Sequence, residues 1–147
     1  MSALVRVAAA LLFDTDGRVL LAQRPQGKSM AGLWEFPGGK LDGAETPEQA
    51  LRRELREELG IDLRRCHLLR QLRHDYGQYV VELEAFVVDE YRGEPAGLEG
   101  QRLQWVSPAA LSQQALLPAD LPIVDALNAQ EVNAHGAGHR HAGYPAR

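Results

Sequence analysis

The segment between Thr46 and Gly60 constrains the fold more than any other part of the chain. Thr46 is followed by Pro47 and then, three positions after Thr46, by Gln49. This order is typical of a capping box with proline at the first helical position. Gly60 follows Leu59 and supplies a C-terminal stop. We therefore predict a helix over residues 47–59.

This predicted helix has faces of different chemistry. At about 100° per residue, three leucines form one stripe that we expect in the core: Leu51, Leu55 and Leu59. Three glutamates lie at i, i+3 and i+4 on an adjoining stripe: Glu54, Glu57 and Glu58. Three arginines take the opposite side: Arg52, Arg53 and Arg56. Like charges at this spacing repel, and the repulsion is less screened beside a buried face. A solvated charged face is one interpretation, and a site for a hard cation such as Mg²⁺ is the other.

The rest of the chain alternates between strand and helix signals. Residues 4–13 are predicted as a buried strand, 14–17 as a turn and 18–24 as a second strand that completes a hairpin. Further extended segments are expected at residues 33–36, 67–76, 80–88 and 103–106, and helices are expected after Ser107 and over 121–128. Because hairpins are mixed with helices, we predict an α/β fold with a mixed sheet between helices.

Length and composition bound the organisation and the compartment. The chain of 147 residues suits one domain, which we place at residues 1–128, followed by a flexible, small and polar tail at 129–147. The net charge of −4 argues against binding a nucleic acid polymer, and no apolar stretch is long enough to cross a membrane. The single Cys66 excludes an internal disulfide, which is compatible with a cytoplasmic protein. Both a monomer and a homodimer remain open.

The loop before the predicted helix adds to the cation interpretation. Gly38 and Gly39 let the backbone approach a ligand closely and offer carbonyl oxygens to a metal. Glu45 precedes the helix, where its charge meets the positive end of the helix dipole. Read as one string, residues 39–61, GKLDGAETPEQALRRELREELGI, match the Nudix box at every defined position. The chain therefore resembles the Nudix hydrolase superfamily over roughly residues 4–128.

The resemblance implies a Nudix fold and a set of roles. Nudix proteins typically hydrolyse a nucleoside diphosphate linked to another group and use Mg²⁺ or Mn²⁺. The implied metal ligands are Glu54, Glu57, Glu58 and the Gly38 carbonyl. Arg53 would orient Glu54, whereas the structural positions of the box are Gly39, Glu45 and Gly60.

Outside the box, the segments LWEFPGGK and LEGQ and the residue Trp105 resemble the MutT branch. This branch hydrolyses a nucleoside triphosphate to the monophosphate and pyrophosphate. By resemblance, Glu99 would reach the metal cluster from a loop and is an alternative to Glu54 as the general base. Arg24 would face the nucleotide, and Phe36 is a further candidate for substrate binding, where core packing is the alternative.

The residue at the base-reading position departs from the MutT pattern. MutT-like proteins often place Asn where this chain has Asp120. An ionised carboxylate only accepts hydrogen bonds, so Asp120 could read a guanine-type base or the amine of cytosine, or it could cap a helix. The segments EGQ and LRHDY resemble enzymes that remove 8-oxo-dGTP, which we expect as the substrate, whereas GLWEF and PADLP resemble relatives that prefer CTP or a modified dCTP, which is the alternative. A domain that binds nucleotides without hydrolysis is an alternative of another class.

Overall fold

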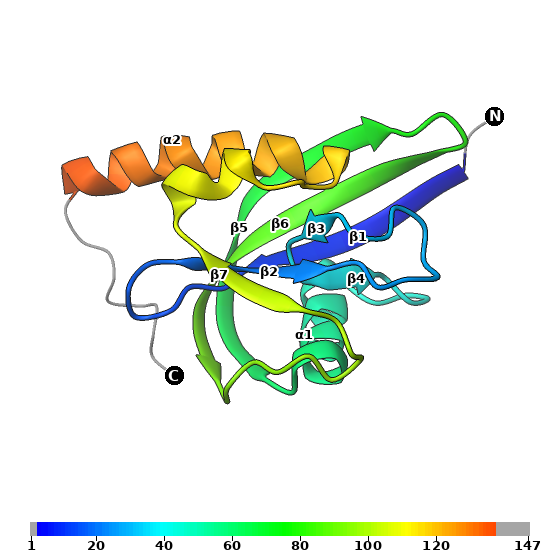
Figure 1. Cartoon of the computed structure of the whole chain (residues 1–147), viewed down its shortest axis with the longest axis horizontal. Coiled ribbons are helices and arrows are strands. Elements are labelled where there is room, and N and C mark those ends of the chain that lie inside the picture. Colours follow the sequence, from blue (N-terminus) through cyan, green and yellow to red (C-terminus); the bar gives the residue numbers. More distant parts are fainter. Residues whose placement is uncertain (1–2, 138–147) are drawn as a thin grey trace.

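The computed structural model describes residues 3–137, which form seven strands, two α-helices and two short 3₁₀ helices within that range (Figure 1). The strands are β1 (Ala3–Leu11), β2 (Val19–Gln23), β3 (Trp34–Glu35), β4 (Gly38–Lys40), β5 (Asp62–Asp75), β6 (Tyr79–Arg92) and β7 (Leu103–Val106). The helices are α1 (Pro47–Leu59) and α2 (Leu121–Ala137), and the 3₁₀ helices are η1 (Pro108–Gln113) and η2 (Pro118–Asp120).

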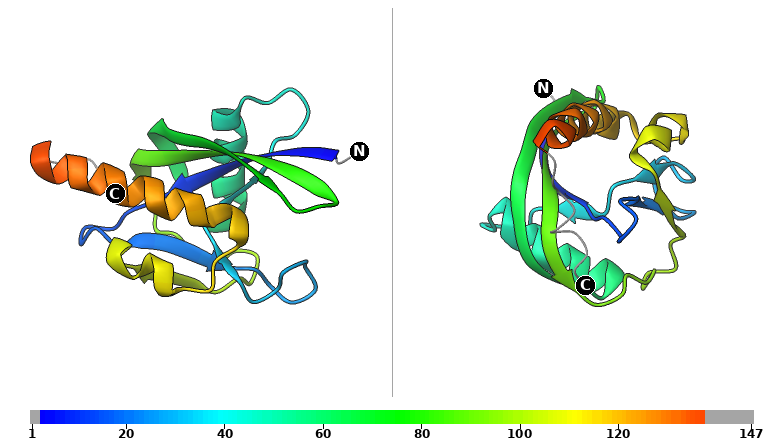
Figure 2. Two further views of the ribbon diagram at one scale, coloured as in Figure 1. Left: turned by 90° about the horizontal axis from the view of Figure 1, so that it is seen from above. Right: turned by 90° about the vertical axis from the view of Figure 1, so that its left-hand side faces the viewer.

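The strands divide into two sheets. The larger sheet has the order β4-β1-β6-β5, in which β1 is parallel to β6 and the other pairs are antiparallel. The smaller sheet has the order β3-β2-β7 and is antiparallel. The larger sheet is mixed and carries helices, so the predicted α/β fold class is confirmed (Figure 2).

Alternate residues of β1 contribute to two hydrophobic clusters. Ala8 and Ala10 pack in the cluster that holds the leucines of α1, whereas Ala9 and Leu11 pack in the cluster that holds Ile123 of α2. Successive side chains of a strand point to opposite faces of its sheet. The two helices therefore cover opposite faces of the larger sheet.

The local signals at α1 are confirmed in detail. The Thr46 side chain accepts a hydrogen bond from the Gln49 amide and the Gln49 side chain accepts one from the Thr46 amide, which completes the capping box. Gly60 ends the helix in the left-handed conformation at φ 72°. The leucine stripe is fully buried, with 0% exposure at Leu51, Leu55 and Leu59.

The predicted hairpin of residues 4–13 and 18–24 is wrong as a sheet unit. The chain does turn at Gly17, but β1 and β2 enter different sheets and keep one isolated bridge, between Phe13 and Val19. Both edges of β1 are already used, one by β4 and the other by β6, so β1 has no free edge for β2.

Three other local expectations need correction. Gly38–Lys40 forms the strand β4, which is not among the extended segments that we predicted. The helix after Ser107 is the 3₁₀ helix η1. The helix expected over 121–128 continues to Ala137, so the predicted tail overlaps α2 at residues 129–137, and its residues 138–147 lie outside the described residues. In the described part of the chain, no helix is long and apolar enough to cross a membrane.

Candidate active site

One cavity of about 880 Å³ collects most of the candidate residues from both sheets, α1 and η2. This volume is within the usual range for small-molecule sites. The lining includes four glutamates, Glu54, Glu57, Glu58 and Glu99, which we call the acidic end. It also includes Arg24, Glu35, Phe36 and Asp120, which the Arg24–Glu35 ion pair and the bond from the Phe36 amide to Asp120 join into a second group, called here the other end. The structure thus brings residues from five separate segments of the sequence to one space.

The paired glycines of β4 allow a close approach that no larger residue would permit. A Cβ atom at Gly39 would lie 2.4 Å from Cδ of Glu54, so the Glu54 carboxylate rests against the Gly39 backbone. A Cβ atom at Gly38 would lie 2.0 Å from the backbone oxygen of Ala8, and Gly38 has a φ of +146°. Gly38 is therefore required by the pairing of β4 with β1, whereas Gly39 leaves room for the Glu54 side chain.

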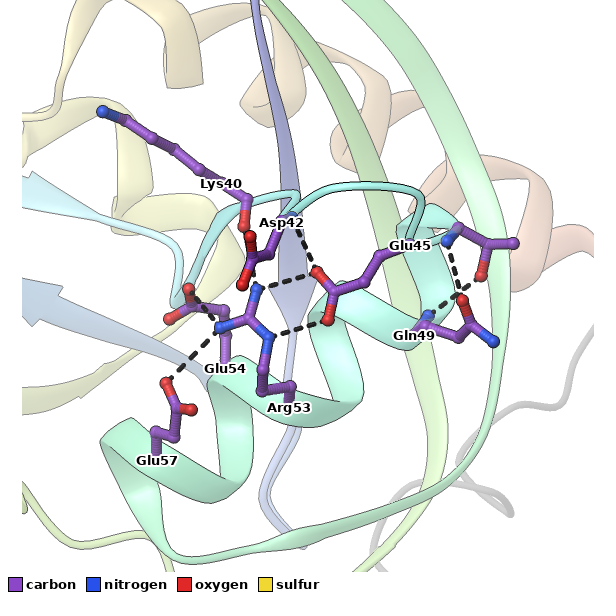
Figure 3. A network of polar contacts seen from close by, with 8 residues as sticks. Lys40, Asp42, Glu45, Gln49, Arg53, Glu54 and Glu57 are labelled. Atoms are coloured by element: carbon purple, nitrogen blue, oxygen red, sulfur yellow. Dashed lines mark hydrogen bonds and ion pairs between the residues drawn. The ribbon is translucent and has the colours of Figure 1, made fainter.

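Arg53 is the centre of the polar network beside the acidic end (Figure 3). Its guanidinium donates to both carboxylate oxygens of Glu45, at 2.7 and 2.9 Å, and to the Lys40 carbonyl oxygen at 3.0 Å. Its Nη1 donates to Glu54 at 3.1 Å and to Glu57 at 3.4 Å. These bonds link the loop before α1 to two of the glutamates.

The prediction that Arg53 lies opposite the glutamates is therefore wrong. Arg53 and Glu57 are an i,i+4 pair and face the same side of α1.

The side-chain hydrogen bonds from Arg53, together with the Asp42 amide, lower the pKa of Glu45 to about 2. The same bonds raise the pKa of Arg53. Both groups stay charged throughout the neutral range.

Glu58 experiences the opposite electrostatic effect. Burial, the adjacent Glu54 carboxyl group and the charges of Glu99 and Glu35 raise the pKa of Glu58 to about 9. A group with this pKa holds a proton at neutral pH unless a positive charge comes close. The acidic end is thus a place where negative charge is crowded and only partly balanced by Arg53.

The loop that carries Glu99 is docked onto the C-terminal end of α1. The carbonyl oxygen of Glu58 accepts from the Leu98 amide at 3.0 Å and from the Gln101 side chain at 3.1 Å. The Gln101 side chain in turn accepts from the Glu99 amide at 2.9 Å. Gln101 is thus a structural residue of the site that the sequence reasoning missed, although the LEGQ segment contained it.

The residues of the acidic end fit a divalent cation by their chemistry. Carboxylate and backbone carbonyl oxygens are the ligands that hard cations prefer, and both kinds are present at Glu54 and Gly38. Among the side chains that the structure describes, residues 3–129, no three acidic, histidine or cysteine groups lie closely enough together to hold one ion. The fit therefore rests on the donor set.

The other end of the cavity holds a half-buried ion pair, of which the sequence analysis had named only Arg24. Arg24 donates to Glu35 at 3.3 and 3.4 Å, and its Nε donates to the Ser29 carbonyl oxygen at 2.8 Å. Burial raises the pKa of Glu35, whereas the charge of Arg24 opposes this effect. Glu35 lies within the LWEFPGGK segment, from which we predicted roles only for Phe36 and the two glycines.

Asp120 is a buried polar residue with 5% exposure at the end of η2. Its Oδ2 accepts a hydrogen bond from the Phe36 amide at 3.1 Å. Burial, with an added contribution from the charge of Glu35, raises the pKa of Asp120 to about 8. The expectation of an ionised group that only accepts hydrogen bonds is therefore wrong near neutral pH, where a largely protonated carboxyl group also donates. Phe36 itself is 3% exposed and packs in the core while it lines the cavity.

The chain is similar in sequence and structure to known proteins. The NUDIX domain model matches residues 8–126. The CTP pyrophosphohydrolase of Escherichia coli (strain K12) is 40% identical over 126 residues, which cover 86% of this chain and 93% of that protein. The 8-oxo-dGTP diphosphatase of Haemophilus influenzae is 39% identical over 124 residues, which cover 84% and 91%.

A similar solved structure comes from an analysis of MutT from Aliivibrio salmonicida and Vibrio cholerae. It has a TM-score of 0.75 and 33% identity, with coverage of 86% of this chain and 98% of that chain. The family match spans most of the described domain and includes the acidic end of the cavity. The chain therefore belongs to the NUDIX domain family and is a Nudix hydrolase, from a family that generally uses divalent metal ions.

Proposed function

We propose that this hydrolase cleaves a nucleoside triphosphate to the monophosphate and pyrophosphate with Mg²⁺, and that 8-oxo-dGTP is its preferred substrate. The observation that carries the proposal is the continuity of one cavity from four glutamates to a buried carboxyl group. A triphosphate with its cations suits the acidic end, and a base suits the other end. Removal of oxidised nucleotides from the cytoplasmic pool is the corresponding role.

The proposed roles at the acidic end follow from the contacts. Bound Mg²⁺, or Mn²⁺ in its place, would neutralise the polyphosphate and so permit attack by water at phosphorus. Glu54, Glu57 and Glu58 would be its carboxylate ligands, together with the Gly38 carbonyl. Glu58 would lose its proton when the cation binds, because a nearby positive charge favours the ionised carboxylate and opposes the effects of burial and of the neighbouring carboxylates. Glu99 would add a further carboxylate from its loop.

Two residues are candidates for the general base. Glu54 is fixed between the Gly39 backbone and Arg53, which gives it a defined position. Glu99 lies in a loop that is held to α1 through Gln101 and the Glu58 carbonyl. Arg53 touches Glu54 and is a positioning residue in either case. The comparison of Glu54→Gln with Glu99→Gln, measured as the pH dependence of kcat, distinguishes the two roles.

The base end supports recognition by Asp120, with Arg24 nearby. A neutral carboxyl group can donate through one oxygen and accept through the other. This pattern complements the O6 and N7–H edge that distinguishes 8-oxo-guanine from guanine, because guanine lacks hydrogen at N7. It also complements the N3 and N4–H edge of cytosine. CTP or a modified dCTP is therefore the second candidate, favoured by the same Asp120 and by the E. coli relative.

A panel of 8-oxo-dGTP, dGTP, CTP and 5-methyl-dCTP tests the substrate. We expect the highest kcat/KM for 8-oxo-dGTP, with release of pyrophosphate in the presence of Mg²⁺. The highest value for either cytosine nucleotide would establish the second candidate, and equal values across the panel would contradict both.

Hydrolysis itself is tested with Glu57→Gln, and Glu48→Gln is the matched control. Glu48 lies on the same helix but outside the cavity, where it contacts Cys66. We expect the first variant to lose pyrophosphate release and the control to retain it. Full turnover in Glu57→Gln would remove the metal assignment. Nucleotide binding by the native chain without any pyrophosphate release would instead support a binding domain.

A further inference from the structure

The tip of the β5–β6 hairpin contacts the turn that carries Asp120. Tyr76 lies between the two strands, and its hydroxyl oxygen accepts a hydrogen bond from the Ala119 amide at 3.0 Å. These residues are 43 positions apart in the sequence. Both line the cavity at the end where Asp120 lies.

The Ala119 amide needs a partner from outside its own turn. The 3₁₀ helix η2 has only three residues, and within it the Asp120 amide bonds to the Leu117 carbonyl oxygen. Ala119 is 6% exposed, and the first amides of a helical turn have no partner within the turn. A buried amide left without a partner is destabilising. The Tyr76 hydroxyl meets this requirement.

Tyr76 is itself held in place by its neighbours. Its ring packs edge-on against His74, with centroids 4.4 Å apart, and lies 5.3 Å from the Tyr79 ring. Its own amide donates to the Tyr79 carbonyl oxygen at 2.9 Å. The Tyr76 side chain therefore has a defined position from which its hydroxyl group contacts η2.

The Asp120 segment is consequently held from three directions. The Leu117 amide donates to the Trp34 carbonyl oxygen at 2.9 Å, which fixes the start of the turn. The Phe36 amide holds the Asp120 carboxyl group, and Tyr76 holds the backbone between these two points. Tyr76 provides the only one of these three contacts that comes from the larger sheet.

We propose that Tyr76 is a positioning residue for base recognition: its hydroxyl, through the Ala119 amide, sets where the Asp120 carboxyl group lies in the cavity. This inference rests on the proposed function. It adds that the β5–β6 hairpin, which contributes none of the glutamates of the acidic end, affects which base is accepted. Tyr76 acts through Ala119 and Asp120, so it affects binding of the base rather than the chemistry at phosphorus.

The test is Tyr76→Phe, which keeps the ring between His74 and Tyr79 and removes one hydroxyl group. Loss of one neutral hydrogen bond corresponds to about a three- to tenfold change in an equilibrium constant. We expect KM for the preferred nucleotide to rise by about this factor with kcat unchanged. Inhibition by inorganic pyrophosphate, which has no base, should keep its inhibition constant.

Tyr91→Phe is the matched control, because Tyr91 is 1% exposed, its hydroxyl donates to the Phe13 carbonyl oxygen and it lies outside the cavity. It should lower the melting temperature without changing KM. An unchanged KM in Tyr76→Phe, or an equal rise in the pyrophosphate inhibition constant, would overturn the positioning role.

Amide hydrogen exchange at Ala119 gives a second readout that does not depend on turnover or on the stability of a variant. In the unmutated protein, we expect the Ala119 amide to be protected, and in Tyr76→Phe it should exchange faster. A rapidly exchanging Ala119 amide in the unmutated protein would refute the inference. If the native chain hydrolysed none of the nucleotides, the proposed function would fail, whereas the exchange rate would still decide whether Tyr76 holds the turn.

Discussion

Replacement of Gly39 by alanine should remove activity and leave the fold intact. The new Cβ atom would lie 2.4 Å from Cδ, 2.5 Å from Oε2 and 2.8 Å from Oε1 of Glu54. Non-bonded carbon atoms rest at about 3.5–4.0 Å, so the carboxylate must retreat by about 1 Å or more. A displacement of about 1 Å in a catalytic group costs on the order of 100-fold in rate. This factor corresponds to about 2.7 kcal/mol in the activation barrier.

The fold should tolerate this change because the clash involves a side chain. The φ of Gly39 lies outside the left-handed region, and Glu54 can adopt another rotamer. Gly38→Ala provides the contrast, since its Cβ would lie 2.0 Å from the Ala8 carbonyl oxygen at a φ of +146°. That substitution should unfold the protein or separate β4 from β1.

The assay combines steady-state hydrolysis with thermal unfolding. Gly43→Ala is the control for the substitution itself, because nothing lies within 4 Å of its Cβ, although its φ of +59° adds backbone strain. We expect Gly39→Ala to lose about two orders of magnitude in kcat at nearly native melting temperature, and Gly43→Ala to keep kcat. A Gly39→Ala variant with native kcat would refute the argument that the Glu54 position depends on this glycine.

Three further predictions follow from the same contacts. The pKa of Glu58 is raised from 4.5 to about 9, so between these pH values the folded metal-free protein retains a proton that the unfolded chain has lost. The free energy of unfolding of the metal-free protein should therefore fall as the pH rises from 4.5 to about 9. Mg²⁺ should reverse that fall in thermal scans, and a stability that rises with pH in the metal-free protein would contradict the assignment. Arg53→Lys should lower kcat by about 10- to 100-fold, because an ammonium group cannot contact Glu45, Glu54 and the Lys40 carbonyl oxygen together. A native kcat in this variant would argue against a positioning role for Arg53. Leu55→Ala should cost about 2–5 kcal/mol in urea unfolding, since Leu55 is fully buried, and a cost below this range would show that α1 contributes less to the core than its burial implies.

The sequence predicted the features that depend on short-range signals. The capping box at Thr46, the stop at Gly60 and the buried leucine stripe of α1 each follow from residues within one helix. The family followed from residues 39–61, which include this helix, and the α/β class followed from the mixture of strand and helix signals along the rest of the chain. These patterns are local, so no knowledge of distant strands was required.

The errors concern partners that are distant in sequence or the physical state of a group. The hairpin was wrong because β4 and β6 occupy both edges of β1, which a linear pattern does not reveal. The bonds from Arg53 to Glu45 could not be foreseen because Glu45 precedes the helix, whereas the side of α1 on which Arg53 lies follows from its local i,i+4 spacing to Glu57 and was assigned wrongly. The protonation of Asp120 depends on burial by residues from several segments, and the same holds for the bond between Tyr76 and Ala119.

The central claim is that three glutamates on α1 bind a divalent cation beneath a triphosphate, and a crystal structure with Mg²⁺ and a non-hydrolysable nucleoside triphosphate analogue tests it most directly. The account predicts a cation about 2.0–2.1 Å from carboxylate oxygens of Glu54, Glu57 and Glu58 and from phosphate oxygens of the analogue. A cation bound by phosphates alone, with these three side chains directed into solvent, would contradict it.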